Sequence, residues 1–265
     1  MRNDLEVITR VYPREQNVLR VYAIGDVHVG SPEFDEKAIK KKLQIIADDP
    51  CVALVLCGDL GDYGLKNSKT NVYKATLNPR QQQEYIYELF KPVVNKVTAA
   101  VPGNHEDRIT REVGTCPLYD LCVRWGIEDV YRENIAITKY VFGSMRGKKQ
   151  QVAFIGLTSH GSTRNKHHRF TGSFDGLDFS CSGHIHRPEY DMGARIRIDR
   201  HHGTASHVAF DELVVDANLM PGGYGLKKEY EIPAPPKLQY LELSYRFAGK
   251  NRDTIRVINY HSIQL

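Results

Sequence analysis

The sequence lacks any long uninterrupted apolar run. No stretch approaches the roughly 20 apolar residues that a helix needs to cross a bilayer, and the first ten residues, MRNDLEVITR, contain no apolar core of a secretory signal. We therefore expect a cytoplasmic protein that does not insert into a membrane. Cysteine is also scarce, with five in 265 residues. Because no two of them have CxxC spacing, we expect buried, reduced thiols and no disulfide framework.

A strong excess of charge of one sign is absent as well. The sequence has 36 Lys and Arg against 32 Asp and Glu, a formal net charge of +4. This is a mild preference for anionic partners, far below the excess of a histone. With 41% hydrophobic residues and no internal repeat, the composition is typical of a globular protein. The prediction is a single domain, residues 1–265, with a core that needs neither disulfides nor structural zinc.

Apolar runs alternate with amphipathic stretches through the first two-thirds of the chain, which is typical of β-α-β folds. Five strands are predicted over 18–24, 51–57, 97–101, 151–157 and about 177–182. Helices are predicted over 33–48 and 79–97. Beyond residue 190 the pattern becomes alternating, which predicts strands over 193–201, 203–215, 238–246 and 253–261.

Metal-capable side chains follow each of the five predicted strands in the first part of the chain. The segments are GDVHVG (25–30), GDLGD (58–62), GNHE (103–106), SHG (159–161) and GHIH (183–186). Because ligand sites of α/β sheets collect beyond the carboxyl ends of the strands, we expect these segments to meet. Each segment alone is an ordinary turn. Together their carboxylate, amide and imidazole groups suit Mn²⁺, Fe or Zn²⁺ and not copper(I).

The five segments resemble the motif set of the calcineurin-like metallophosphoesterase superfamily, and the resemblance spans residues 21–190. It implies an α/β fold, a four-layer α-β-β-α sandwich in which two mixed β-sheets pack face to face. The strand-rich part, 191–265, would complete the second sheet. The resemblance also implies a hydrolase with two divalent metal ions, Mn²⁺ foremost and Fe, Zn²⁺, Ni²⁺ or Mg²⁺ as alternatives. Such a pair of ions stabilises both the attacking and the leaving oxygen at phosphorus.

Position by position, the resemblance implies seven metal ligands and two catalytic residues. The ligands of one metal would be Asp26, His28 and His186. Those of the other would be Asn104, His160 and His184. Asp59 would bridge the two metals. His105 would lie near the leaving-group oxygen and protonate it or stabilise its charge, and Asp62 would orient the imidazole of His105.

The substrate is specified less closely than the metal centre. Phosphoprotein phosphatases of this superfamily carry an arginine directly after the GDxxD segment, where this sequence has Tyr63. Without that bidentate contact, recognition of a phosphomonoester is weaker. The loop 162–170 carries three cationic residues suited to the phosphates that flank a scissile diester, Arg164, Lys166 and Arg169. The alternative interpretation of this loop is a solvated charged surface.

These features predict a phosphodiesterase that acts on nucleic acid, either DNA or RNA, or on a nucleotide. A phosphomonoesterase acting on phosphoprotein or a small ester is the alternative, and Glu106 of the GNHE segment favours it. A third hypothesis is a non-catalytic binding scaffold of the same fold, which the intact ligand set argues against. The sequence leaves the native metals, endo- or exonucleolytic action and the oligomeric state open.

Overall fold

A computed structural model of the chain describes residues 4–66, 68, 72–143, 151–161, 174–199, 201, 203–220, 236–248 and 253–265. The strands are β1 (Ile8–Tyr12), β2 (Val18–Ile24), β3 (Val52–Leu56), β4 (Val97–Ala100), β5 (Ile135–Phe142), β6 (Val152–Ser159), β7 (Phe179–Ser182), β8 (Glu189–Asp199), β9 (Thr204–Val214), β10 (Lys237–Ala248) and β11 (Asp253–Gln264). The α-helices are α1 (Glu36–Asp48), α2 (Pro79–Phe90), α3 (Asn104–Val113) and α4 (Pro117–Trp125). Short 3₁₀ helices cover Val72–Lys74, Lys91–Lys96 and Glu128–Val130.

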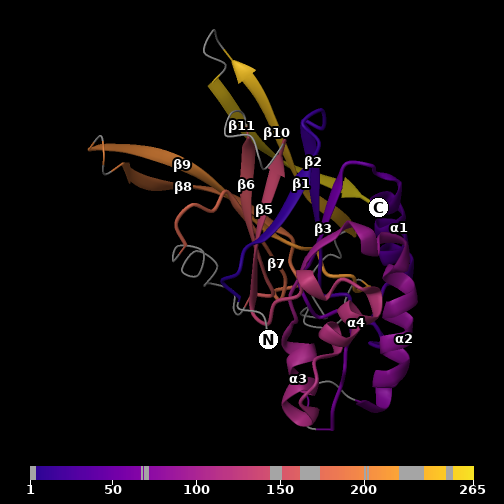
Figure 1. The fold of residues 1–265 in the computed structure, drawn as a ribbon. Helices are drawn as coiled ribbons and strands as arrows, with labels where there is room; N and C mark the ends of the chain where they lie inside the picture. The colour runs from indigo at the N-terminus through magenta and orange to yellow at the C-terminus, as the bar shows by residue number, and fades with distance from the viewer. Residues whose placement is uncertain are drawn as a thin grey trace, which may run out of the picture.

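Two sheets form the centre of the molecule (Figure 1). One has five strands in the order β11-β10-β2-β3-β4, and the other has six in the order β1-β5-β6-β7-β9-β8. Both are mixed: β2 and β3 run parallel beside the antiparallel pair β10–β11, and β1–β5 is parallel beside antiparallel β5–β6. A buried apolar cluster that draws on both sheets lies between them. The predicted α/β fold with two mixed sheets packed face to face is confirmed.

The strand β3 shows why its sequence is a continuous apolar run. All five of its residues are buried, because both faces of this strand are covered. Ala53 and Val55 belong to the cluster between the sheets, whereas Leu54 and Leu56 belong to the cluster under the helices. This alternation is the two-residue period of a strand, and here both halves of the period are apolar.

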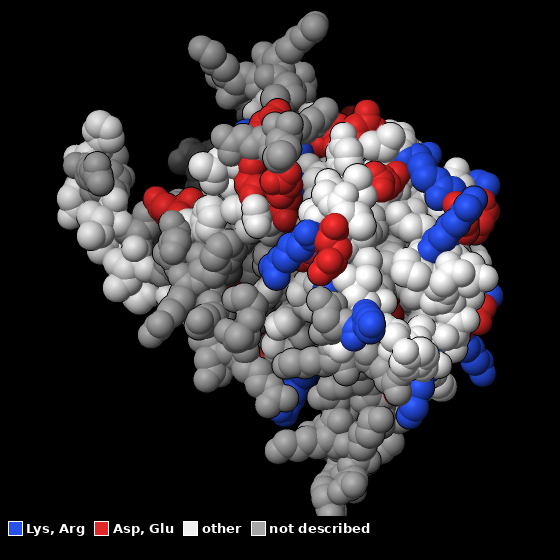
Figure 2. All heavy atoms as spheres, turned by 90° about the horizontal axis from the view of Figure 1, so that it is seen from below, with Lys and Arg blue, Asp and Glu red and all other residues white. Residues whose placement is uncertain are grey.

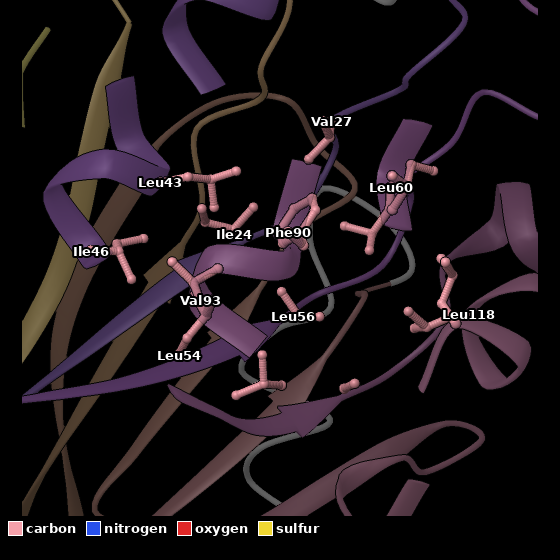
Figure 3. Packing of buried hydrophobic residues seen from close by; sticks show 14 of the residues in the cluster. Ile24, Val27, Leu43, Ile46, Leu54, Leu56, Leu60, Phe90, Val93 and Leu118 are labelled. Atoms are coloured by element: carbon pink, nitrogen blue, oxygen red, sulfur yellow. The ribbon is translucent and has the colours of Figure 1, made fainter. Parts of the chain in front are cut away.

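All four helices of the described residues contribute to the cluster on the outer face of the five-stranded sheet. Figure 3 shows Leu43 and Ile46 of α1, Phe90 of α2 and Leu118 of α4 around Leu54 and Leu56. Full burial of one such side chain stabilises the fold by about 1.5–3 kcal/mol. None of these helices is long and apolar enough to span a membrane.

The helix predicted over 79–97 is shorter in the structure. It begins as expected at Pro79, where Asn78 caps it by accepting from the Gln81 amide at 3.0 Å. It ends at Phe90 and continues as a 3₁₀ helix. Pro92 accounts for the change, because it has no amide hydrogen and its ring clashes with the carbonyl four residues earlier.

The residues after 190 divide between the two sheets, which corrects the prediction that 191–265 completes one sheet. Strands β8 and β9 join the six-stranded sheet, but β10 and β11 join the five-stranded one. Leu241 and Leu243 of β10 lie opposite Val21 and Leu19 of β2 and enter the cluster between the sheets. Alternation of apolar and polar residues predicts a half-buried strand, but it does not determine which of the two sheets the strand joins.

Candidate metal centre

Five loops meet at one edge of the two-sheet sandwich. Strands β2, β3 and β4 run parallel, so the loops that follow them leave the sheet at the same end. Strands β6 and β7 are also parallel and supply two loops from the other sheet. Backbone hydrogen bonds join neighbouring loops, from Asp26 N to Gly58 O at 3.0 Å and from Gly183 N to His160 O at 3.1 Å. The sheet topology therefore brings together the five segments singled out in the sequence.

A first group of donor atoms comes from the loops after β2 and β7. His186 Nε2 lies 3.2 Å from Asp26 Oδ1, and His28 Nε2 lies 3.8 Å from the same oxygen. The two imidazole nitrogens are 3.0 Å apart. Asp26 and His28 have no exposed surface. These three residues form a compact set able to hold a metal ion.

A second group comes from the loops after β4, β6 and β7. The side-chain oxygen of Asn104 lies 3.0 Å from His160 Nε2 and 2.8 Å from His184 Nδ1. Asp59 Oδ2 is 3.2 Å from His160 Nε2. Asp59 also belongs to two candidate metal groups, one with His160 and one with His28. All seven residues predicted as ligands therefore lie in one cluster, with the buried Asp59 between its two halves.

The backbone of these loops is strained where the side chains converge. Six non-glycine residues in the described part of the chain have φ between 42° and 76°. They are Asp26, His28, Asp59, Tyr63, His184 and His186. This left-handed conformation costs of the order of 1–3 kcal/mol per residue and gathers at functional sites. Five of the six are predicted ligands, so the strain coincides with the cluster.

Two glycines allow the loops to approach each other. A Cβ at position 103 would overlap the carboxylate of Asp59, and a Cβ at position 183 would overlap that of Asp26. Each of these carboxylates also accepts a backbone hydrogen bond at 2.8 Å, Asp59 from His105 N and Asp26 from His184 N. The glycine preceding each ligand therefore serves the close packing of one loop on another.

Glu106 holds two of the loops together and was not predicted to do so. Its buried carboxylate accepts three backbone hydrogen bonds, from Asp59 N at 2.8 Å, Leu60 N at 2.8 Å and Gly103 N at 2.9 Å. Burial, together with the neighbouring Asp59, raises the pKa of Glu106 to about 7. One part of this role could be found from the sequence. Glu106 is the third residue of α3, a position from which glutamate caps the start of a helix.

His105 lies beside the cluster and is oriented mainly by the backbone. Its Nδ1 is 2.6 Å from the Asp62 carbonyl oxygen, and the Asp62 carboxylate is further away, at 3.5 Å. Because a carbonyl only accepts, Nδ1 is the protonated nitrogen. His105 Nε2 lies 3.8 Å from Asp59 Oδ2. The two residues that the sequence paired are in contact, although the nearer contact is the carbonyl.

The charges inside the cluster suit a cation. Burial raises the pKa of Asp59, but the charge of His160 and its contact with Asp59 outweigh it and hold that pKa well below its usual range. Burial lowers the pKa of His28, and His105 lowers it further. Burial also lowers the pKa of His160, but Asp59 raises it to about 10. Asp59 is therefore an anion and His28 is neutral at pH 7, and metal binding at His160 would require it to release a proton.

The donor set fits divalent metal ions. It consists of carboxylate and amide oxygens with imidazole nitrogens, a mixture that suits borderline and hard divalent ions. Asp26 Oδ1 is buried, and no donor among the described residues makes a hydrogen bond to it. A buried carboxylate oxygen in that situation is costly unless a cation is present.

The three predicted substrate-binding residues, Arg164, Lys166 and Arg169, lie outside the described residues.

Acidic and basic side chains are interspersed on the face seen in Figure 2, and the described part of that face has no continuous basic patch. The mixture agrees with the small net charge of +4. Strong binding to a polyanion through many phosphate contacts calls for clustered Lys and Arg. The described part of this face therefore adds no support for nucleic acid as the substrate.

Comparison with known proteins identifies the family. The family model described as calcineurin-like phosphoesterase matches residues 19–188, well over half of the chain, and the match includes all five loops. No curated protein matches the chain. One solved structure that matches is a hypothetical protein from Thermus thermophilus, with 11% identity and a TM-score of 0.38 over 93% of this chain and 99% of that chain. The family match and the buried His and Asp cluster together show that this chain belongs to the calcineurin-like phosphoesterases and is a metal-dependent phosphoesterase.

Proposed function

We propose that the protein hydrolyses phosphodiesters at a centre of two divalent metal ions. The ligands are Asp26, His28, Asp59, Asn104, His160, His184 and His186. The observation that supports this assignment is their convergence from five loops into two groups that share Asp59. Bound ions supply Lewis-acid activation of water and of the phosphoryl group. Mn²⁺ is the first metal to test, followed by Fe, Zn²⁺, Ni²⁺ and Mg²⁺.

The protein's own contribution at the leaving group is His105. Its Nδ1 proton is held by the Asp62 carbonyl at 2.6 Å, which leaves Nε2 as the atom that carries or releases a second proton. A proton at Nε2 passes to the departing alkoxide oxygen as the ester bond breaks. Asp62 is then a positioning residue, acting through its carbonyl and, at 3.5 Å, through its carboxylate.

The preference for a diester rests on the position that holds an arginine in the phosphatase branch. Tyr63 occupies it here, is 1% exposed, and donates from its hydroxyl to Gln83 Oε1 at 2.7 Å. This side chain therefore offers the phosphate no cation. A diester carries one negative charge at phosphorus and depends less on such a cation than a dianionic monoester does. Nucleic acid as the substrate depends on Arg164, Lys166 and Arg169 and stays a prediction.

Reconstitution with Mn²⁺ tests the centre. Elemental analysis should approach two ions per chain, and Asp59→Asn should lower the occupancy of both sites, because both share this residue. Asp48→Asn removes an exposed carboxylate from α1 and should leave the count unchanged. A reconstituted protein that never binds more than one ion contradicts the binuclear assignment.

A substrate screen tests the reaction. Bis-para-nitrophenyl phosphate, para-nitrophenyl phosphate and a single-stranded oligonucleotide should be compared at equal metal loading. We expect the diester to be cleaved with the higher kcat/KM of the two nitrophenyl compounds. A preference for the monoester would replace the diesterase assignment with a phosphatase. A metal-loaded protein inactive on every ester would favour the scaffold hypothesis.

A further inference from the structure

A cavity of about 730 Å³ lies beside the metal centre, between α3, α4 and the segment that leads into β5. Its size falls in the range of about 300–1,000 Å³ that is usual for small-molecule sites. One wall is formed by Asp107, Thr110 and Gly114 of α3 and its end. The opposite wall includes Glu133 and Asn134, immediately before β5.

Both walls of this cavity lie next to loops of the metal centre, although none of the lining residues is a predicted ligand. Asp107 follows the predicted ligand Asn104 by about one helical turn and lies on the same side of α3. Thr110 and Gly114 continue this wall towards the end of the helix. On the other wall, β5 begins at Ile135, which pairs with Ser159, the residue before His160. The cavity therefore runs along α3, close to the loops that carry the predicted ligands.

The lining of the cavity is acidic. Four carboxylates contribute to it, Asp107, Asp120, Glu128 and Glu133. Among the lining residues, the only cation is Arg132, which is 2% exposed. Its guanidinium donates to the backbone carbonyls of Glu6, Asp129 and Tyr131 at 2.8–3.3 Å. The charge of Arg132 thus stabilises the backbone, and the cavity repels additional phosphates.

Aromatic rings complete the lining. Tyr119 and Tyr131 contact each other edge to face, with ring centroids 5.2 Å apart, and both border the cavity. Tyr131 is buried, whereas Tyr119 is 44% exposed. The face of a tyrosine ring attracts an ammonium group, and the attraction is strongest where water is partly excluded. Carboxylates beside tyrosine rings are a combination that binds organic cations.

We propose that this cavity binds an ammonium group carried by one of the two alcohols of the phosphodiester substrate. Asp107 lies one helical turn beyond Asn104, about 5 Å along the axis. In a diester of an amino alcohol, the ammonium nitrogen lies four bonds from the reacting phosphorus, which is a comparable reach. The proposal rests on the proposed phosphodiesterase function and narrows its substrate to diesters of amino alcohols.

Two matched substrates test the proposal. Para-nitrophenyl phosphocholine and para-nitrophenyl 3,3-dimethylbutyl phosphate share a leaving group and a shape, and differ in the positive charge. We expect the wild-type kcat/KM to favour the cationic diester roughly tenfold, mainly through KM. Asp107→Asn combined with Asp120→Asn should bring the ratio close to one. Glu15→Gln removes an exposed carboxylate in the turn before β2, at the opposite end of that strand, and should preserve the ratio.

Active enzyme with equal kcat/KM for the two diesters overturns the cavity proposal and leaves the phosphodiesterase function intact. If neither diester is cleaved, the proposed function fails, and titration calorimetry of the Mn²⁺-loaded protein with choline tests the cavity alone. Saturable choline binding that Asp107→Asn weakens supports the site, whereas no binding overturns it. Tyr119→Leu, at a half-exposed position, is the second variant if the double variant does not fold, and should also lower the ratio.

Discussion

At the scale of single residues, His105 offers the clearest separation of metal binding from catalysis, since its Nε2 lies 3.8 Å from Asp59 Oδ2 but it is not one of the seven predicted ligands. We predict that His105→Ala keeps two metal ions and loses about 10²–10⁴-fold in kcat on diesters of alkyl alcohols. The loss should be smaller for para-nitrophenyl esters, because that leaving group needs little protonation. Metal analysis and steady-state kinetics on a leaving-group series measure both effects.

The matched control is His207→Ala, an exposed histidine on β9, which should change neither metal content nor kcat. Losses of equal size across leaving groups of very different pKa would argue against proton donation by His105. They would instead assign the imidazole a positioning role, through its Nε2 at 3.8 Å from Asp59 Oδ2.

The convergence of the seven predicted ligands was accessible from the sequence because each one lies within four residues of the end of a strand. The resemblance to the family then gave their order. The contacts of Glu106 were not accessible, since its partners Asp59 and Leu60 lie 47 and 46 residues away. The contact of His105 with the Asp62 carbonyl could not be predicted either, because every residue has a carbonyl and the side chains do not indicate which one is used. The role of the loop 162–170 stays a prediction, because this loop lies outside the described residues.

At the scale of secondary-structure elements, Lys96 closes the carboxyl end of α1. Its ammonium donates to the carbonyls of Ile46, Ala47 and Asp49 at 2.6–2.7 Å, and these groups otherwise lack partners at a helix end. We predict that Lys96→Met, which retains the aliphatic stem, lowers the unfolding free energy by about 1–3 kcal/mol. Urea denaturation followed by far-ultraviolet circular dichroism measures this change.

Lys40→Met is the comparison on the same helix. Lys40 pairs with Glu36, but both side chains are more than half exposed, at 59% and 51%. An exposed pair of this kind contributes at most about 0.5 kcal/mol. Equal destabilisation by the two variants would show that the three carbonyl contacts of Lys96 add nothing beyond a surface charge.

The elements that the sequence predicted well are those with continuous apolar runs. The prediction for β2 matches its observed bounds, Val18–Ile24, and that for β3 is one residue longer at each end. The helix α3 was missed because its sequence, NHEDRITREV, buries only His105 and Glu106 and has almost no apolar face. The edge strand β1 was missed as well, since only Ile8 of its five residues is buried. Burial of one face produces the spacing of apolar residues from which an element is predicted. Polar elements at the surface therefore show little of this spacing.

At the scale of the whole molecule, Lys42 of α1 joins the first part of the chain to the last. Its Nζ lies 3.7 Å from Asp216 Oδ2, and the two side chains are 3% and 16% exposed. Asp216 follows β9 and also accepts from the amide of Lys237 at the start of β10. Burial lowers the pKa of Lys42 to about 8, although Asp216 offsets part of the shift.

The folded protein therefore binds fewer protons at Lys42 than the unfolded chain does between pH 8 and 10.5, the ordinary value. Stability must rise with pH across that window. We predict that the wild type gains about 2 kcal/mol relative to Lys42→Met between pH 7 and 9.5. Denaturant unfolding of both proteins over that range tests this, and parallel stability curves would show that Lys42 keeps an ordinary pKa.

The strained loops have a consequence for the order of assembly. Donors at positions 26 and 186 meet only when β2 and β7, which belong to different sheets, are already in place. A chain whose sheets have not yet formed does not hold the five predicted ligands in left-handed conformations. It therefore offers no preformed metal site. We therefore expect metal capture to be a late event that selects completed molecules, and the folded fraction to increase with the free metal concentration by mass action. Newly made chains in a metal-poor compartment would fold without this stabilisation. They would be more susceptible to proteolysis than metal-bound chains.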